Sequence, residues 1–228
     1  MNDWATAARK FVRASQGGSL ATHSLSHTGY PFASFVSFVP DGHALPVLLV
    51  SPLAEHSRNA EADSRASLMI QPPSPEPQSA ARVTLMGELQ RIDADETFVE
   101  RYVRYLPQAE RLLGLGDFYF VRLTPKAIRF IGGFGAIRWV SPVDYEPRWR
   151  TNPRLELDTL NQLKRDHPNL LQRLASTFCG PATQAEWVGL DCDGLQLRTD
   201  SLIRVDIPKP ADDVNSLVAA LALNATAQ

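Results

Sequence analysis

Apolar residues alternate with polar ones along several stretches of the first two thirds of the chain, as in strands with one buried face. The alternation, together with short apolar runs, predicts strands at residues 19–24, 32–39, 47–50, 68–70, 82–92, 118–123 and 127–131. Apolar residues at helical spacing instead predict helices at residues 3–14 and 95–106. Because helices interrupt the strands at irregular intervals, we predict a closed, six-stranded antiparallel barrel rather than a doubly wound sheet.

Glycine and proline mark the irregular points of this barrel. Four prolines within residues 71–79 exclude a strand or helix interior and predict an exposed loop. Gly87 predicts a bulge or bend in its strand, and Thr124-Pro125-Lys126 predicts a hinge between the last two strands. The run Gly132-Gly-Phe-Gly135 allows close approach of the backbone to another group.

Residues 45–70 predict a strand, a short helix and a second strand. The continuous apolar run at 47–50 is typical of a strand buried on both faces. Ser51 is expected to be the helix N-cap, with Pro52 at the first helical position. The helix carries side chains that suit a phosphate or a carboxylate, namely His56, Ser57, Arg58 and Asn59. A solvated helix face accounts for the same residues, so the segment alone leaves both interpretations open.

A change in pattern near residue 148 predicts a domain boundary. Residues 141–153 hold three prolines and little periodicity. We therefore expect one domain over residues 1–148 and a small α+β domain over residues 149–228. In the second domain the pattern predicts a helix at 156–178 that is interrupted at Pro168, then three short strands at 184–190, 195–197 and 202–207, and a last helix at 214–223.

Composition narrows the function classes. The 228 residues carry 23 basic and 25 acidic side chains, a net charge of −2, which disfavours a nucleic-acid partner. No apolar run approaches the length of a membrane span, and the N-terminus lacks signal-peptide character, so a cytoplasmic protein without a membrane partner is expected. Cys179 and Cys192 lack zinc-site spacing, and a reduced pair is expected.

Several blocks of the sequence, in order along nearly the whole chain, resemble the FMN-binding split-barrel superfamily of pyridoxamine-phosphate oxidases, in its haem-utilisation branch. The first domain contributes Leu53-Ala-Glu-His-Ser-Arg-Asn59, Ser64-Arg-Ala-Ser-Leu68, Ala81-Arg-Val-Thr-Leu-Met-Gly87, Glu100-Arg-Tyr102, Gly116-Asp-Phe-Tyr-Phe120, and Phe130-Ile-Gly-Gly-Phe-Gly135 with Trp139. The second contributes Asp166-His167, Gly189-Leu-Asp-Cys-Asp-Gly194 and Arg204-Val-Asp-Ile-Pro208. Relatives commonly carry Met-Asn-x-Asp-His, whereas Leu163-Lys-Arg-Asp-His167 lacks the Asn.

The resemblance implies a split barrel that forms a homodimer, with ligand sites at the subunit interface. It implies cofactor contacts from Ser51, His56, Ser57, Arg58, Asn59 and Arg82. His56 stands where the oxidases carry a phosphate-binding lysine, and a neutral imidazole is the weaker anion ligand. We therefore predict haem rather than FMN as the cofactor, with FMN as the alternative. His167 is the weak candidate for a haem ligand in the second domain, and a capping or packing role there is the favoured interpretation.

Two classes of function remain open at this point. The first is an enzyme, a haem-degrading or flavin-dependent oxidoreductase. The second is a non-catalytic carrier or regulator that binds haem or flavin on the same scaffold. No pair of residues forms an obvious acid–base couple, and in both chemistries the cofactor performs the difficult step. The catalytic residues are therefore not identified by the sequence.

Overall fold

The computed structural model describes residues 3–133, 135–180 and 184–224. The chain divides into two compact units. The first contains residues 1–95 and 106–146, and the second contains residues 96–105 and 147–228. The second unit thus includes a helix that precedes residue 148 in the sequence. Two consecutive domains that meet at residue 148 remain a prediction.

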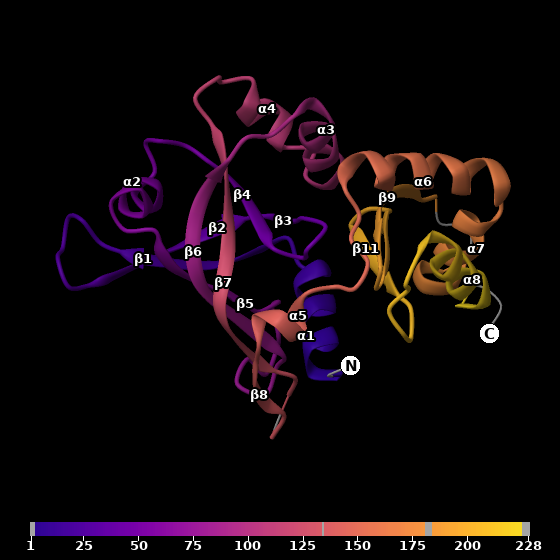
Figure 1. Cartoon of the computed structure of the whole chain (residues 1–228), viewed down its shortest axis with the longest axis horizontal. Helices are drawn as coiled ribbons and strands as arrows, with labels where there is room; N and C mark the ends of the chain where they lie inside the picture. The colour runs from indigo at the N-terminus through magenta and orange to yellow at the C-terminus, as the bar shows by residue number, and fades with distance from the viewer. Residues whose placement is uncertain (1–2, 134, 181–183, 225–228) are drawn as a thin grey trace. The chain divides into compact units, whose positions relative to one another are not determined.

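The first unit is built around a curled antiparallel sheet (Figure 1). Its strands are β1 (Gly17–His23), β2 (Pro31–Ser37), β3 (Val39–Pro40), β4 (Pro46–Val50), β5 (Arg65–Ile70), β6 (Arg82–Ile92), β7 (Tyr119–Ile131) and β8 (Ile137–Val140). They follow the order β2-β1-β5-β6-β7-β4-β3, and β8 also pairs with β7. The predicted antiparallel barrel is confirmed.

The barrel differs from the sequence prediction in three ways. The described edge strands β2 and β3 are not hydrogen-bonded to each other, so the barrel is split, as the family resemblance implies, rather than closed, as the alternation alone predicts. Strand β8 is additional, and the strand predicted at 32–39 is divided into β2 and the two-residue β3. The predicted hinge at residues 124–126 is absent. β7 runs through it without interruption, and Pro125 lies buried inside the strand.

The pairing of β6 with β7, the longest strands of the sheet, contains a bulge. The register shifts between Met86 and Gly87, and Lys126 on β7 has no partner residue on β6. A Cβ atom on Gly87 would lie 2.0 Å from the carbonyl oxygen of Thr124, so only glycine fits there. The predicted bulge at Gly87 is confirmed, and the predicted loop at 71–79 is irregular and mostly exposed. Phe134 lies outside the described residues.

Four helices belong to the first unit: α1 (Asp3–Arg13), α2 (Glu55–Ala62), α4 (Ala109–Leu113) and α5 (Pro142–Tyr145). Ala5, Ala8 and Val12 of α1 pack into the core that the inward residues of the sheet form. Arg9 is buried beside them, and its Nη1 donates to the carbonyl oxygen of Tyr145 at 2.9 Å. This hydrogen bond ties α1 to α5.

The second unit is a small α+β structure. It contains α3 (Glu96–Tyr105), α6 (Pro153–Asp166), α7 (Leu170–Cys179), α8 (Val214–Asn224) and the antiparallel strands β9 (Glu186–Asp191), β10 (Gly194–Arg198) and β11 (Leu202–Asp206). Helices α6 and α7 replace the single predicted helix and are separated around Pro168, as its interruption indicated. Within the described residues, no helix combines the length and apolar character of a membrane span.

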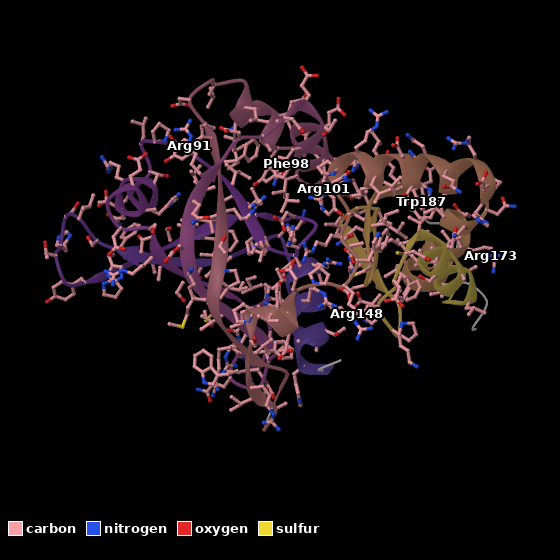
Figure 2. The ribbon with its side chains drawn as sticks, in the orientation of Figure 1. Arg91, Phe98, Arg101, Arg148, Arg173 and Trp187 are labelled. Atoms are coloured by element: carbon pink, nitrogen blue, oxygen red, sulfur yellow. The ribbon has the colours of Figure 1, made fainter. Side chains whose placement is uncertain are left out.

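A buried carboxylate organises this unit. Glu156 of α6 is fully buried, forms an ion pair with Arg101 of α3, and accepts hydrogen bonds from the Tyr105 hydroxyl at 3.0 Å and the Leu190 amide at 3.2 Å. Figure 2 labels Arg101 on α3. Burial, followed by the charge of Glu156, raises the pKa of Tyr105, so the phenol stays protonated. Each partner satisfies part of the buried charge, which would otherwise be costly.

The closeness of these groups leaves no room at Gly189 and yields a stability prediction. A Cβ atom there would lie 1.7 Å from the Tyr105 hydroxyl and 2.4 Å from Oε1 of Glu156. We expect Gly189→Ala to lower the free energy of unfolding by about 3 kcal/mol, because it overpacks the core and displaces a buried hydrogen bond. Urea unfolding measures the change. Gly114→Ala is the control, since the nearest neighbour to a Cβ there is at 3.5 Å. Equal stability of the two variants would contradict the tight-contact interpretation.

Candidate functional site

Two hollows in the described part of the first unit bear on its function, and they lie on opposite faces of the sheet. The one beneath α2 has a volume of about 380 Å³ and is called the end cavity. It is lined by Leu20, Leu48, Val50, His56, Ser57, Ala60, Glu61, Ser64, Leu89, Arg91, Tyr119 and Val121. The other lies on the outer face of β1, β5, β6 and β7, has a volume of about 500 Å³, and is called the outer hollow. Its lining includes His23, Arg65, Ser67, Met86 and Lys126.

Helix α2 begins later than predicted. Its first residue is Glu55, and the N-cap is Ala54, which offers no side-chain hydrogen bond. The Ser51 hydroxyl instead accepts from the Leu53 amide at 3.2 Å, inside the turn that precedes the helix. The prediction of Ser51 as N-cap was therefore wrong, because that turn adds three residues before the helix starts. Glu55 does lie in the first turn, as its favourable interaction with the helix dipole requires.

Two of the predicted cofactor residues line the end cavity. His56 is half-buried, and its Nδ1 lies 3.1 Å from the Ser34 hydroxyl. Burial lowers the pKa of His56, so the imidazole is neutral at pH 7. Ser57 is 2% exposed, and its hydroxyl has no hydrogen-bond partner of normal geometry, although it is near enough to Tyr119 to influence the pKa of that phenol.

The rest of the polar rim comes from residues that the sequence analysis did not select. The Tyr119 hydroxyl donates to Oε1 of Glu61 at 3.0 Å, and burial and Glu61 together raise the pKa of Tyr119. The Arg91 guanidinium lies over the Tyr119 ring, 4.4 Å from its centroid. Figure 2 labels Arg91, at the end of the sheet where α2 lies. The sequence could have indicated Arg91 through the alternation of β6. Arg91 follows the buried Leu89 at a spacing of two, which places both residues on the same face of the strand.

The two remaining polar residues of the predicted α2 site have other partners. Arg58 is exposed, and its Nη2 lies 2.7 Å from Oε2 of Glu55 in an ion pair. Asn59 is fully buried, where its Nδ2 donates to Thr22 Oγ1 at 3.0 Å and its Oδ1 accepts from the Leu25 amide at 3.0 Å. The amide of Asn59 thus fastens α2 to β1, and cofactor binding by either residue stays a prediction.

Arg82 lies far from this group. It begins β6, whereas Arg91 lies near the other end of that strand, so the two are separated by roughly 30 Å at the usual rise per residue. The Nη1 of Arg82 donates to the carbonyl oxygens of Gln78 at 3.1 Å and Ala80 at 3.2 Å. The structure therefore does not bring Arg82 together with the α2 residues, and its predicted flavin contact stays untested.

A row of mostly small side chains lines part of the outer hollow. Ala21, Ser67, Met86 and Ala127 follow one another across adjacent strands: Ala21 is opposite Ser67, Ser67 is opposite Met86, and Met86 is opposite Ala127. Small residues in register leave room for a flat ligand to lie against the sheet.

Charged and aromatic groups surround this row. The exposed His23 closes one end of the hollow. Arg65 donates through Nε and Nη2 to the carboxylate of Asp63, and that interaction holds the pKa of Asp63 well below its usual range. Lys126 Nζ lies 3.7 Å from Oε2 of Glu88. The rim thus offers one imidazole, two cations and the carboxylate of Glu88.

Other candidate ligands do not form a site with these residues. His167 is exposed, follows α6 as its C-cap, and lies in the second unit beside Asp166. This C-cap position agrees with the capping alternative, and haem ligation by His167 stays a prediction. Asp191, Cys192 and Asp193 cluster within 4.8 Å, but both carboxylate oxygens of Asp191 are held by Arg204. Cys179 and Cys192 form no disulfide.

Comparisons with known proteins agree with this architecture. The family model of the CREG β-barrel matches residues 1–147. The chain is 34% identical over 127 residues to a non-canonical heme oxygenase, the chloroplastic HOZ of Arabidopsis thaliana, and the match covers 55% of this chain and 39% of that protein. This chain therefore spans about two fifths of the length of that curated relative.

Two solved structures align over nearly the whole chain. A heme-binding protein from Mycobacterium smegmatis is 31% identical, with 97% of this chain and 96% of that chain covered and a TM-score of 0.58. A protein of unknown function from Agrobacterium tumefaciens is 24% identical, with 98% and 95% covered and a TM-score of 0.77. The second similarity concerns the fold alone.

The half-buried imidazole of His56 in the end cavity yields a testable pH dependence. We expect the pKa of His56 to lie below 6.5, and a side-chain NMR titration measures it directly. An unfolded chain protonates this histidine near pH 6.5, so stability from neutral His56 is lost as the pH falls through that value. His56→Gln should therefore make the loss of unfolding free energy between pH 7.5 and pH 5.5 smaller, whereas the exposed-site variant His27→Gln should not. A pKa of 6.5 or more for His56 would contradict the burial argument.

Proposed function

The chain belongs to the CREG β-barrel family, within the haem-utilisation split-barrel superfamily, and from this premise we propose that it binds haem in the outer hollow. A second copy of the chain covers the exposed side of the ligand in this proposal. Support comes from a relative that is itself described as heme-binding and aligns over 96% of its length, and from one described as a heme oxygenase. The observation that carries the location is the row of mostly small residues with an imidazole in the same lining.

The residues of the outer hollow fit the chemistry of haem. A flat macrocycle can lie on the row of Ala21, Ser67 and Ala127, where its apolar surface leaves water. His23 offers a nitrogen ligand of the type that holds haem iron. The two propionates can be met by Arg65 and Lys126. Arg65 can serve Asp63 and a propionate together, because a guanidinium has five N–H donors.

FMN has less support than haem. A flavin phosphate needs charge-assisted donors, and the predicted α2 cradle supplies one cation, Arg58, which also pairs with Glu55. The outer hollow supplies two cations, Arg65 and Lys126. His56 is neutral because of its burial, and Asn59 uses both ends of its amide inside the fold. The α2 segment therefore lacks a concentration of positive charge for a phosphate dianion, and we keep haem as the proposed cofactor.

A degrading enzyme and a carrier share the binding step and differ in the fate of the bound haem. Bound haem supplies the redox-active iron, whereas the residues of the outer hollow would bind and orient it. Oxidative degradation needs electrons from an external donor. Loss of the haem absorption under air with ascorbate, accompanied by release of iron, identifies a degrading enzyme, and a stable spectrum identifies a carrier. A cytoplasmic location likewise remains part of the proposal.

The haem site is tested by titrating haemin into the purified chain. We expect a defined Soret maximum for the unmodified protein. His23→Ala should shift that maximum and weaken binding about tenfold, equivalent to about 1.4 kcal/mol, because the iron loses its nitrogen ligand. His27→Ala is the matched control, because His27 lies in the turn that follows β1 and does not line the outer hollow. An unchanged spectrum for His23→Ala, together with a lost maximum for His167→Ala, would reject His23 in favour of the second unit. A flavin band that stays with the protein through desalting after FMN addition, together with weak haemin binding, would reject haem itself.

The dimer is tested through the outer sheet face. Phe35, Met69 and Trp139 are exposed to 75%, 39% and 60% and belong to one row across the sheet. We expect light scattering at micromolar concentration to give twice the chain mass of 25.2 kDa. Met69→Glu should give a folded monomer, because two copies of a buried carboxylate would face an apolar surface.

The control for the dimer test is Leu53→Glu, which places the same charge on a 77% exposed leucine before α2. This variant should remain dimeric. A monomeric unmodified chain, or dimers from both variants, would contradict the proposed interface without affecting the fold.

A further inference from the structure

The end cavity is a separate space from the outer hollow, because the two lie on opposite faces of the sheet. On β1, the buried Leu20 lines the end cavity, whereas Ala21 and His23 line the outer hollow. On β6, Leu89 belongs to the cavity, whereas Met86 belongs to the hollow. A ligand of the end cavity would therefore not compete directly with haem on the outer face.

The cavity has an apolar interior and a polar mouth. Its inner wall consists of side chains that are at most 8% exposed: Leu20, Leu48, Val50, Leu89 and Val121. The volume of about 380 Å³ lies within the range of cavities that hold small organic ligands. An apolar wall of this size favours a ligand whose body is a ring or a short hydrocarbon chain.

One buried polar atom faces this space without a regular partner. The Ser57 hydroxyl lines the cavity at 2% exposure and makes no hydrogen bond of normal geometry. A buried hydroxyl without a partner is unfavourable, and a polar atom of a ligand would satisfy it. Beside it, His56 is neutral and adds hydrogen-bonding capacity without charge.

The charge at the mouth fits a single carboxylate. The Cζ atom of Arg91 lies 4.4 Å from the centre of the Tyr119 ring, and a cation–π contact of this kind leaves guanidinium N–H donors for a ligand. Among the described residues, no carboxylate forms an ion pair with Arg91. Glu61 already accepts the Tyr119 hydroxyl, and the raised pKa of Tyr119 keeps that phenol uncharged. Arg91 is thus the cation available to a ligand, and one guanidinium can bind one carboxylate with two hydrogen bonds.

We propose that the end cavity binds a small monocarboxylic acid with an apolar body, its hydrocarbon part against the strands and its carboxylate on Arg91. A phosphate ester fits less well, because its dianion would meet one cation, a neutral imidazole and the carboxylate of Glu61. This site would be additional to haem binding and does not depend on it.

Two probes of equal shape test the proposal on the full chain. Sodium 3-phenylpropionate carries the carboxylate, and 3-phenylpropanamide replaces it with a neutral amide. In calorimetric titrations we expect the acid to bind at least tenfold more tightly than the amide. Arg91→Gln should reduce the affinity for the acid about tenfold, to the level of the amide. Arg154→Gln is the control, because that arginine is 73% exposed and lies outside the cavity.

A second variant fills the cavity instead of changing its charge. Ala60→Phe should abolish binding of both probes, because Ala60 lines the cavity on α2. Amide shifts in the NMR spectrum of the unmodified chain, expected in residues 56–64 and 119–121, locate the probe independently of any variant. The absence of binding overturns the proposal. Equal affinity for acid and amide, or an unchanged affinity in Arg91→Gln, overturns the assignment of a carboxylate ligand. Unchanged haemin binding in Arg91→Gln is also expected, and its loss would contradict the independence of the two sites.

Discussion

The pairing of β6 with β7 is the constraint on which the first unit depends. These strands are the longest of the sheet, and each carries residues of both hollows on its two faces. Their register is fixed around a bulge where Gly87 meets the Thr124 carbonyl and Lys126 is the extra residue. A shift of one residue would exchange the inner and outer side chains. The bulge therefore determines both the packing of the core and the composition of the two sites.

The two faces of the sheet have different chemistry for the same reason. Inward residues such as Leu20 and Leu89 are buried and leave a cavity with a polar mouth under α2. Outward residues in the same strands are small, charged or exposed and apolar, which suits a flat ligand and a second protein surface. One antiparallel sheet can thus offer two ligand sites without a change of backbone.

The second unit is organised by a buried charge instead. Glu156 reaches Arg101, Tyr105 and the Leu190 amide, so one carboxylate connects α6 with α3 and β9. Removal of one partner from such a group costs far more than an exposed ion pair contributes. These hydrogen bonds and this ion pair of Glu156 hold α3 to α6 and β9. They explain why α3 belongs to the same unit as residues 147–228, although it lies well ahead of them in the chain.

The sequence by itself determined the antiparallel barrel, the bulge at Gly87, most helices and the haem-related superfamily, because alternation, helical spacing and motif order are local or linear properties. Only the tertiary structure decided which side chains meet. It separated Arg82 from His56 by most of the length of β6, buried Asn59 as a fastening for α2, and brought Arg91 and Tyr119 to the cavity. In the tertiary structure, β7 also continues through Pro125. These outcomes depend on strand register and on contacts between distant residues, which no local pattern encodes.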